Sequence, residues 1–370
     1  MTPYWTVFLS LSILAVLFNR RAAPAIGQRF DNSIGIIWWV TLIPFFIFFI
    51  GFRGQVGGDW GSYKGSFNSG LYMPLFMKLT TTGQSVDPGF VLLQHTLGQL
   101  GYTFVSQAVV SSFVFTVGLL KFSKTLPRPY LALAVAFPYM IVVVAMGYMR
   151  QSIAIGITMY ALEALIKKQN IKFFSWVIFA AFFHKSSIIF LPLAVLVSTK
   201  NRFFIFIAGI ALFLIAYFVF VESQLERFTR YYIGQEYSSS GAGIRVAMLV
   251  LPATLFLIYR KKFNLEPIEY KIWSVFSWIS YPLMFAVIFL NISTTVDRFA
   301  LYALPLQLFL FSHLPDVFKK SKRIITILIL LYYALVLFVW LNFATNAFSW
   351  LPYTNELVGY KRREDGAYDI

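Results

Sequence analysis

Four basic residues stand at the predicted outer ends of membrane segments, where the positive-inside rule predicts few cations. They are Arg150, Lys185, Arg245 and Arg298. Arginine presents a planar fork of donors that matches phosphate oxygens in pairs, and lysine adds a compact positive charge. Such cations, brought together from separate segments, could bind a lipid phosphate or diphosphate at a membrane surface. His184 and Asp297 are ionisable neighbours of two of them.

A second group of candidate residues would suit a sugar. Asp59 lies in the Gly-rich segment 53–87. Carboxylates accept hydrogen bonds from hydroxyl groups, and flat aromatic faces can cover a sugar ring. The aromatic candidates in the polar segments are Trp60, Tyr63, Tyr231 and Tyr232. The cations predict a lipid phosphate and this second group predicts a sugar, so together they predict a lipid-linked sugar as the ligand.

The leaving group decides what chemistry these residues would have to supply. When a sugar is transferred from a lipid diphosphate, the diphosphate departs as the anion of a strong acid, so no general acid is needed. Positive charge must stabilise that anion as it forms, and Arg150 and the other cations would provide it. The acceptor hydroxyl could need a base, for which Asp59 is the leading candidate and Asp87 or His184 are alternatives. For Asp87 we favour another role, that of capping the helix after Pro88.

Other chemistries find no support in the sequence. The polar segments contain no DxD or ExD pair, so we expect a metal-independent reaction without a cofactor. Motifs for zinc proteolysis, phosphate-binding loops and nucleophile elbows are missing. The chain has no Cys, which excludes disulfides and thiolate nucleophiles.

Composition tells what kind of protein must position these groups. The 370 residues are 59% hydrophobic and 12% charged, whereas soluble domains carry about 25% charged residues. Disorder is excluded because it requires low hydrophobicity. The net charge of +16 comes from small basic clusters between apolar runs. This arrangement is typical of a polytopic membrane protein and does not indicate a nucleic-acid partner.

The apolar runs predict an all-α membrane protein, because a crossing helix needs about 20 apolar residues. Run 88–120 is too long for one span, so we expect a short helix near 88–100 and a crossing helix from about residue 103. Run 173–199 carries His184 and Lys185 at its middle, which predicts two short half-spans meeting there. The runs are 4–18, 35–52, 88–120, 129–148, 150–166, 173–199, 203–221, 244–259, 271–291, 298–314 and 324–343.

These runs give about 11–12 transmembrane segments, with residues 1–370 forming a single membrane domain. Basic clusters mark the cytoplasmic side, and they alternate correctly if 173–199 crosses twice or returns to its starting side. A continuous helix there would break the alternation at Lys200. Segments 53–87 and 222–243 are then external loops and 344–370 an external tail. The cytoplasmic clusters are Arg20/Arg21/Arg29, Lys121/Lys124/Arg128, Lys167/Lys168/Lys172, Lys200/Arg202, Arg260/Lys261/Lys262/Lys271 and Lys319/Lys320/Lys322/Arg323.

Each candidate also has a simpler interpretation. A lone arginine at a membrane surface can extend to lipid headgroups, and Asp297 could simply pair with Arg298. Tyr231, Tyr232 and Trp350 could belong to an aromatic belt. The placement of four cations from four helix ends on one face favours a shared ligand.

Five short stretches, in order along most of the chain, resemble conserved features of one family. Residues 56–63 are similar to a Gly-x-Asp-Tyr-x-x-Tyr stretch, 87–93 to Glu-Pro-Gly-Phe-x-x-Leu, 150–154 to Arg-Gln-x-hydrophobic-Ala and 183–187 to Phe-His-x-Ser. Arg298 with Tyr302 is similar to an Arg-x-x-x-Tyr feature. The family is the EpsG family of Wzy-like polysaccharide polymerases. Trp60 stands where that family usually has Tyr, and Asp87 where it usually has Glu.

The resemblance implies a polymerase at the outer face of the bacterial cytoplasmic membrane, with a helical fold similar to GT-C glycosyltransferases. It would transfer a growing glycan from one undecaprenyl diphosphate to another lipid-linked repeat unit. Asp59, His184 and Arg150 would be catalytic, and Tyr302 would join the sugar-binding residues. Arg150, Lys185 and Arg298 would bind the diphosphates with His184 beside them, and Arg245 would be a weaker member. The bilayer is a partner, and whether a chain-length regulator binds is left open.

Three rival functions fit parts of the pattern. A ligase would move the glycan to lipid A, and an acyltransferase would also favour a histidine in a helix break, as at His184. A flippase or exporter should carry charges along a path through the middle of the bilayer. The cations here gather at one face, which favours an enzyme.

Overall fold

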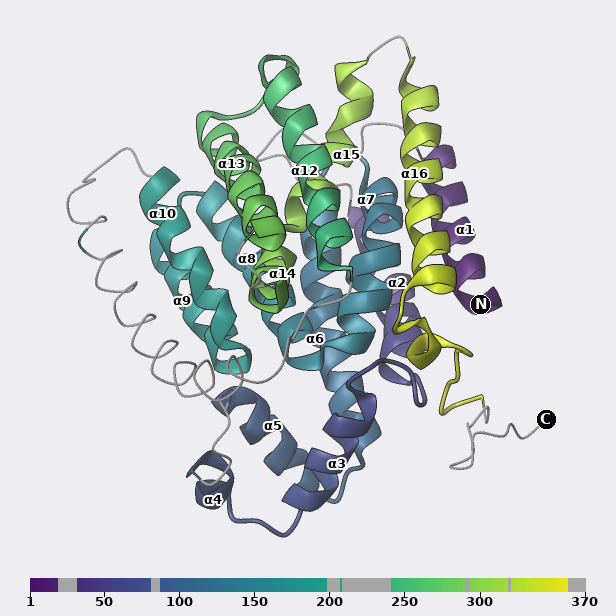
Figure 1. The fold of residues 1–370 in the computed structure, drawn as a ribbon, viewed down its shortest axis with the longest axis vertical. Coiled ribbons are helices and arrows are strands. Elements are labelled where there is room, and N and C mark those ends of the chain that lie inside the picture. Colours follow the sequence, from purple (N-terminus) through teal and green to yellow (C-terminus); the bar gives the residue numbers. More distant parts are fainter. Residues whose placement is uncertain are drawn as a thin grey trace.

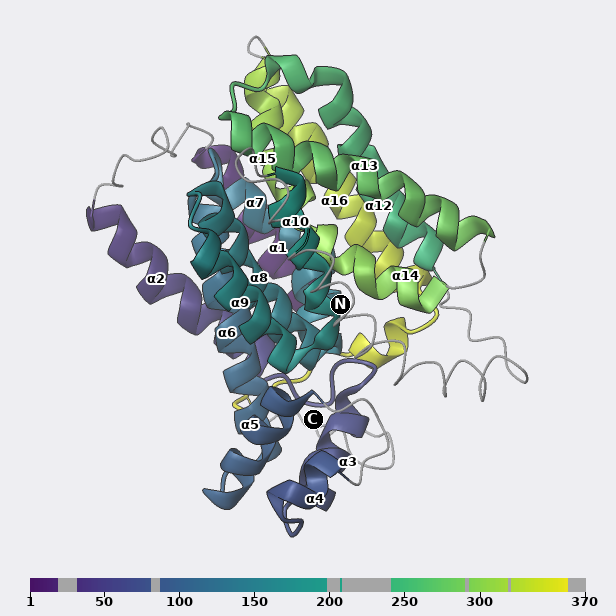
Figure 2. The ribbon, with the colours of Figure 1, turned by 90° about the vertical axis from the view of Figure 1, so that its left-hand side faces the viewer.

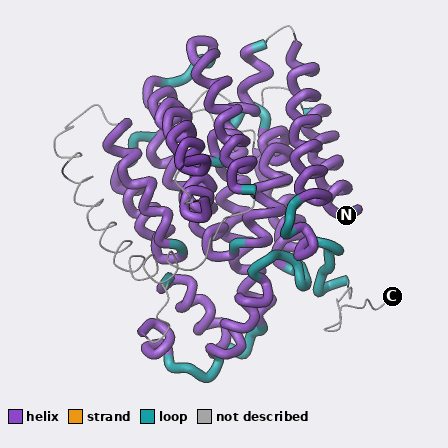
Figure 3. The backbone as a smooth tube through the Cα atoms, in the orientation of Figure 1, coloured by secondary structure: helices purple, strands orange, loops and turns teal. Residues whose placement is uncertain are grey.

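The computed structural model describes residues 1–18, 32–80, 87–197, 207, 241–289, 293–318 and 321–358. Helices dominate these ranges, and none of them contains a strand (Figure 3). Four helices are long and apolar enough to cross a membrane, and five shorter apolar helices accompany them. The expected all-α polytopic membrane class is therefore confirmed. The four are α6 (Phe104–Lys124), α12 with η4 (Ala242–Lys262), α13 (Pro267–Phe289) and α16 (Lys322–Phe343).

The remaining helices form the rest of the bundle and one cap at its end (Figure 1). They are α1 (Thr2–Leu17), α2 (Asn32–Phe46), η1 (Ile47–Gly51), α3 (Trp60–Gly70), α4 (Leu75–Thr80), α5 (Pro88–Gln99), α7 (Pro129–Ala136), η2 (Phe137–Ala145), α8 (Met149–Ile166), α9 (Asn170–Phe183), η3 (Lys185–Phe190), α10 (Leu191–Val197), α14 (Ser293–Ala300), η5 (Leu301–Ala303), α15 (Pro305–Val317) and η7 (Ala347–Trp350).

The centre of the bundle is the continuous segment formed by α7 and the π-helix η2. Every residue from Leu131 to Ala145 is buried, as expected for a helix that is apolar all round. Helices α1, α6, α15 and α16 contact α7. The predicted span 129–148 is therefore the core on which the other helices pack.

Both long apolar runs divide as the sequence predicted. Run 88–120 forms α5 and then α6. In run 173–199, α9 ends at Phe183 and His184 is extended, with φ −158° and ψ 115°. The chain reverses there, because α10 contacts α9 instead of continuing away from it. The two predicted half-spans thus form a hairpin with His184 at its turn.

The two ends of the bundle carry different charges. Helices α3, α4 and α5 gather at one end, here called the α3–α5 end (Figure 2). At the opposite end, Arg128 forms paired bonds of 2.9 Å with Asp316, and Lys121 pairs with Glu163. Arg128 and Lys121 both belong to the cluster predicted to be cytoplasmic, and that assignment to a side of the membrane stays a prediction.

Helices α6 and α8 approach each other more closely than ordinary side chains allow. A Cβ atom added to Gly118 would lie 2.1 Å from the carbonyl oxygen of Gly156, and one added to Gly156 would lie 2.7 Å from the backbone of Phe115. Small residues permit this contact between helices in membranes. It fixes α8, whose first turn carries Arg150.

Candidate functional site

The candidate site is organised around the carboxylate of Asp87, which is 4% exposed. One of its oxygens lies 3.0 Å from Nη1 of Arg150 and 3.3 Å from Nδ1 of His184. The other accepts a 3.2 Å hydrogen bond from the backbone N–H of Lys185. One acidic group therefore joins residues that are 63 and 97 positions away in the chain.

Three helix ends meet to make this contact possible. Asp87 precedes α5, Arg150 lies in the first turn of α8, and His184 occupies the break after α9. Gly89 brings α5 against α9, since a Cβ atom at this position would lie 3.0 Å from the carbonyl oxygen of Phe182. This close approach places Asp87 within reach of His184.

The capping role that the sequence favoured for Asp87 is wrong. Asp87 occupies the position before α5, and its backbone carbonyl accepts bonds from Phe90 and Val91. Its side chain, however, makes no capping hydrogen bond. The carboxylate turns instead toward Arg150 and His184, because a buried charge gains more from a cation than from a neutral amide.

Helix α3 presents the predicted sugar-binding residues to the same cluster. The guanidinium carbon of Arg150 lies 5.9 Å from the centre of the Tyr63 ring, within the range of a cation–π contact. Tyr63 also packs against Phe90, and Trp60 packs edge-on against Phe104. The α3 aromatics are therefore fixed between α5, α6 and Arg150.

Asp59 stands exposed just before α3, and its side chain makes no capping bond. The surrounding protein raises the pKa of the Asp59 carboxyl by desolvation, whereas the positive charges of Arg298 and Arg150 lower it. Asp59 therefore lies within the electrostatic reach of both arginines. The sequence prediction that these three residues share one site is consistent with this placement.

Arg298 is held by its backbone and leaves its side chain exposed. Gln151 of α8 donates a 2.7 Å hydrogen bond to the carbonyl oxygen of Arg298, which ties α14 to the helix that carries Arg150. Among the described residues, the guanidinium of Arg298 enters no ion pair. Its charge thus faces the surface at the same end of the bundle.

Arg245 differs from Lys185 and Arg298 because its side chain forms an ion pair with a carboxylate. It forms two bonds with Asp297, of 2.7 and 2.9 Å. The partner of Asp297 is therefore a residue of α12 and not its neighbour Arg298. A paired fork of this kind connects α12 to α14 and leaves Arg245 with little net charge for a ligand.

Tyr302 packs in a different way from the other aromatic candidates. Its ring is 2% exposed and meets Phe190 edge-on at 5.8 Å, while Ser186 donates a 3.2 Å hydrogen bond to its hydroxyl. The hydroxyl therefore points toward the segment of Lys185, and the ring belongs to the apolar interior. Tyr231 and Tyr232, also predicted to bind sugar, lie outside the described residues, as do run 203–221 apart from residue 207 and residues 359–370 of the tail.

Sequence reasoning missed Arg53, which anchors the loop that leads to Asp59. Its side chain is 1% exposed and donates to the carbonyl oxygens of Ile50 and Val56 at 2.6 and 3.0 Å. Burial lowers the pKa of Arg53 to about 10. Nothing in the local sequence distinguishes this arginine from one that reaches lipid headgroups.

The C-terminal segment completes the support of this loop. The backbone N–H of Gly54 donates a hydrogen bond to the carbonyl oxygen of Thr354. The N–H of Glu356 donates one to the carbonyl oxygen of Phe52. The indole of Trp350 donates a 2.7 Å bond to the carbonyl oxygen of Val142 in η2. Part of the predicted tail, up to residue 358, is thus packed against the bundle, and Trp350 is a buried anchor there.

No group of three or more His, Asp or Glu side chains that could hold a metal ion occurs among the residues described. The expectation of a metal-independent reaction stays a prediction. The nearest pair of such groups in the candidate site is Asp87 with His184.

Comparison with known proteins identifies the family. The family model of the EpsG family matches residues 36–355. The chain belongs to the EpsG family. The matched range contains every candidate residue of the site, from Asp59 to Tyr302. This family is associated with polysaccharide polymerisation, so the EpsG resemblance noted from the short stretches is confirmed. No curated protein and no solved structure matches the chain.

Proposed function

We propose that this EpsG-family protein is a glycosyltransferase-type polymerase that joins undecaprenyl-diphosphate-linked oligosaccharides at the outer face of the bacterial cytoplasmic membrane. The observation that supports the proposal best is the group around Asp87. It gathers Arg150, His184 and Lys185 at one end of a membrane bundle. Asp59 lies within electrostatic reach of both Arg150 and Arg298.

The cations of this group would bind the diphosphates of donor and acceptor. Among the described residues, Lys185 and Arg298 form no ion pair, so a phosphate would not have to displace a protein carboxylate. Arg150 is 39% exposed and is oriented by Asp87 and Tyr63. Arg245, paired with Asp297, would hold α12 and α14 in place and contribute to the ligand only weakly.

The reaction would be a displacement at the anomeric carbon of the donor sugar. The acceptor hydroxyl oxygen forms the new bond to this carbon while the bond to the diphosphate oxygen breaks. The electron pair leaves with the undecaprenyl diphosphate, whose charge the cations stabilise. The proton of the hydroxyl passes to a base, for which the exposed Asp59 carboxylate is well suited because its pKa is raised.

Several finer features belong to the proposal. We infer that the donor and acceptor are both lipid-linked, that no metal takes part, and that the helical architecture is of the GT-C type. The grouping of the cations at a single bundle end supports an enzyme over a transporter, because a transporter needs polar groups along its path through the bilayer.

The test is reconstitution in lipid vesicles with a defined undecaprenyl-diphosphate-linked repeat unit, with and without a chelator. We expect polymer in both conditions. Arg150→Ala and Arg298→Ala should abolish it, whereas Arg323→Ala, which removes an exposed arginine at the opposite end, should not. Polymer of normal length from both site variants would contradict the diphosphate site.

The same preparation separates the rival functions. A ligase would require lipid A as the acceptor, and an acyltransferase would leave the chain length of the glycan unchanged. In cells, deletion of the gene should leave single repeat units on surface lipid. Accumulation of repeat units on the cytoplasmic leaflet would indicate a flippase and would refute the polymerase.

A further inference from the structure

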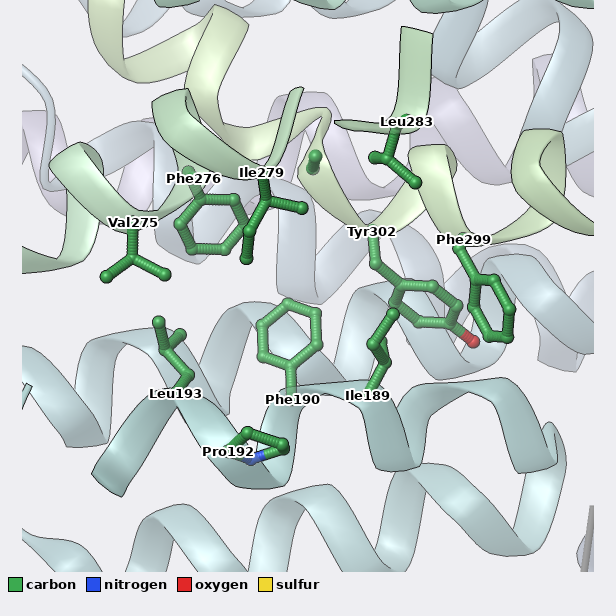
Figure 4. Close-up of a pocket in the computed structure, with 11 residues that line it drawn as sticks. Ile189, Phe190, Pro192, Leu193, Val275, Phe276, Ile279, Leu283, Phe299 and Tyr302 are labelled. Atoms are coloured by element: carbon green, nitrogen blue, oxygen red, sulfur yellow. The ribbon is translucent and has the colours of Figure 1, made fainter. Parts of the chain in front are cut away.

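An apolar pocket lies between the helical hairpin and α13 (Figure 4). The pocket is partly open to the surroundings. One wall comes from η3 and α10 and the facing wall from α13, while Phe299 and Tyr302 stand at one end. Nearly all of its surface is hydrocarbon, from Phe190, Leu193, Phe276, Ile279 and their neighbours.

The long direction of the pocket follows α13. Val275, Ile279 and Leu283 are spaced four residues apart and form one wall, so this wall extends about 12 Å along the helix axis. α13 is one of the helices able to cross a membrane. The pocket therefore runs in the direction that a lipid chain takes in a bilayer.

Two apolar residues that line the pocket also lie at the surface of the bundle. Ile189 and Ile279 both line it, and they are 42% and 43% exposed. Trp278 and Phe285, also in α13, are exposed as well. In a membrane bundle an exposed apolar surface contacts hydrocarbon chains, so a chain can enter sideways without crossing water.

One end of the pocket touches the candidate site. The ring of Tyr302 lines the pocket, and its hydroxyl bonds to Ser186, the residue after Lys185. Phe299, also at this end, follows Arg298 in α14. Lys185 and Arg298, which form no ion pair among the described residues, are thus the chain neighbours of residues at this end of the pocket. A ligand that fits both parts has a phosphate group attached to a single hydrocarbon chain.

We propose that this pocket binds the polyprenyl chain of the lipid-linked substrate, next to its diphosphate, an inference that rests on the proposed function. The chain is far longer than the pocket, so only its first isoprene units are bound by the protein and the rest lies in the bilayer. The pocket fixes the position of the diphosphate relative to Lys185 and Arg298. It also lets the spent lipid carrier leave sideways after transfer.

The experiment is photo-cross-linking in nanodiscs with undecaprenyl diphosphate that carries a diazirine on one of its first isoprene units. Adducts should map to residues 189–193 or 275–283. Leu283→Trp, which fills the pocket, should weaken labelling about tenfold, the effect of removing roughly two methylene groups from apolar contact. Ile327→Trp, on an exposed apolar position of α16, should leave it unchanged. If Leu283→Trp does not fold, Ile189→Trp at the opening provides the same test.

Competition identifies the source of the lipid. Unlabelled undecaprenyl diphosphate should suppress the adducts, and phosphatidylglycerol at equal concentration should not. Equal suppression by both, or adducts spread over the exposed face of α16, would overturn the proposal. Cross-linking requires no glycosyl transfer, so the pocket is tested separately from the polymerase: adducts at 275–283 without polymer would refute the proposed function alone.

Discussion

Replacing Asp87 by Asn should disable the site while changing the volume of the side chain very little. The carboxylate accepts hydrogen bonds involving Arg150, His184 and the N–H of Lys185. An asparagine oxygen can still accept the hydrogen bond from the backbone N–H of Lys185. The NH₂ group that replaces the second oxygen is a donor, and it would face the donor Arg150.

The expected cost follows from these contacts. A hydrogen bond to a charged group contributes about 1.5–3 kcal/mol, and an unsatisfied buried partner costs about 1–3 kcal/mol. Arg150 is 39% exposed, so water can replace part of what it loses. We therefore expect Asp87→Asn to lower the free energy of unfolding by about 2 kcal/mol, which is near the lower end of the range obtained by adding the lost hydrogen bond to the unsatisfied partner. Activity should fall further, by about 100-fold, because small displacements of a positioning group have effects of that size.

The assay is the length distribution of the glycan made in vesicles, together with the thermal transition of the purified protein. Asp87→Glu is the first control, because it keeps the charge and is the residue that similar stretches of the family usually carry. Glu163→Gln is the second, because it breaks an ion pair with Lys121 at the opposite end of the bundle. Normal chain lengths from Asp87→Asn, or equal losses from Glu163→Gln, would refute the organising role of Asp87.

Gly118→Ala should lower the yield of folded protein, because the added carbon would lie 2.1 Å from a backbone oxygen of α8. Gly61→Ala, with nothing within 4 Å, is its control, and equal yields would contradict the close helix contact. Arg245→Met should destabilise the protein by about 3–5 kcal/mol, since Asp297 would remain as an unpaired buried charge, and thermal unfolding measures this. A variant with both residues made apolar should recover stability; if it does not, the pair is not the cause. The raised pKa of Asp59 means that its carboxylate forms only at a higher pH than usual, so polymerisation should decline on the acid side and Asp59→Asn should remove that dependence. Because the folded protein binds this proton more tightly, the contribution of Asp59 to stability falls as pH rises through the raised pKa. An unchanged acid limb in Asp59→Asn would exclude Asp59 as the base.

Local sequence patterns predicted the helices well. Apolar runs placed the break between α5 and α6, and the charged pair at the middle of run 173–199 placed the turn at His184. Both signals are local, because hydropathy and the cost of burying a charge in a membrane act on a few neighbouring residues.

Most of the candidate site residues could also be picked out in the sequence, as charged residues with no oppositely charged neighbour beside them in the chain. Arg150, His184, Lys185 and Arg298 stood out because charged groups are costly beside apolar runs. Asp87 was assigned to capping because the adjacent Pro88 is a strong local signal, whereas its actual partners are 63 and 97 residues away. Arg53 and the C-terminal segment gave no signal, because their bonds are to backbone groups of distant loops.

The sequence by itself determined that this protein is a helical membrane bundle, since that property depends on composition and on order along the chain. The tertiary structure decided which charges are paired, which leaves Arg298 exposed and Arg245 neutralised by Asp297. It also placed an apolar pocket beside the polar site. Pairing depends on distances of about 3 Å between side chains, and only the packing of helices such as α6 on α8 sets those distances.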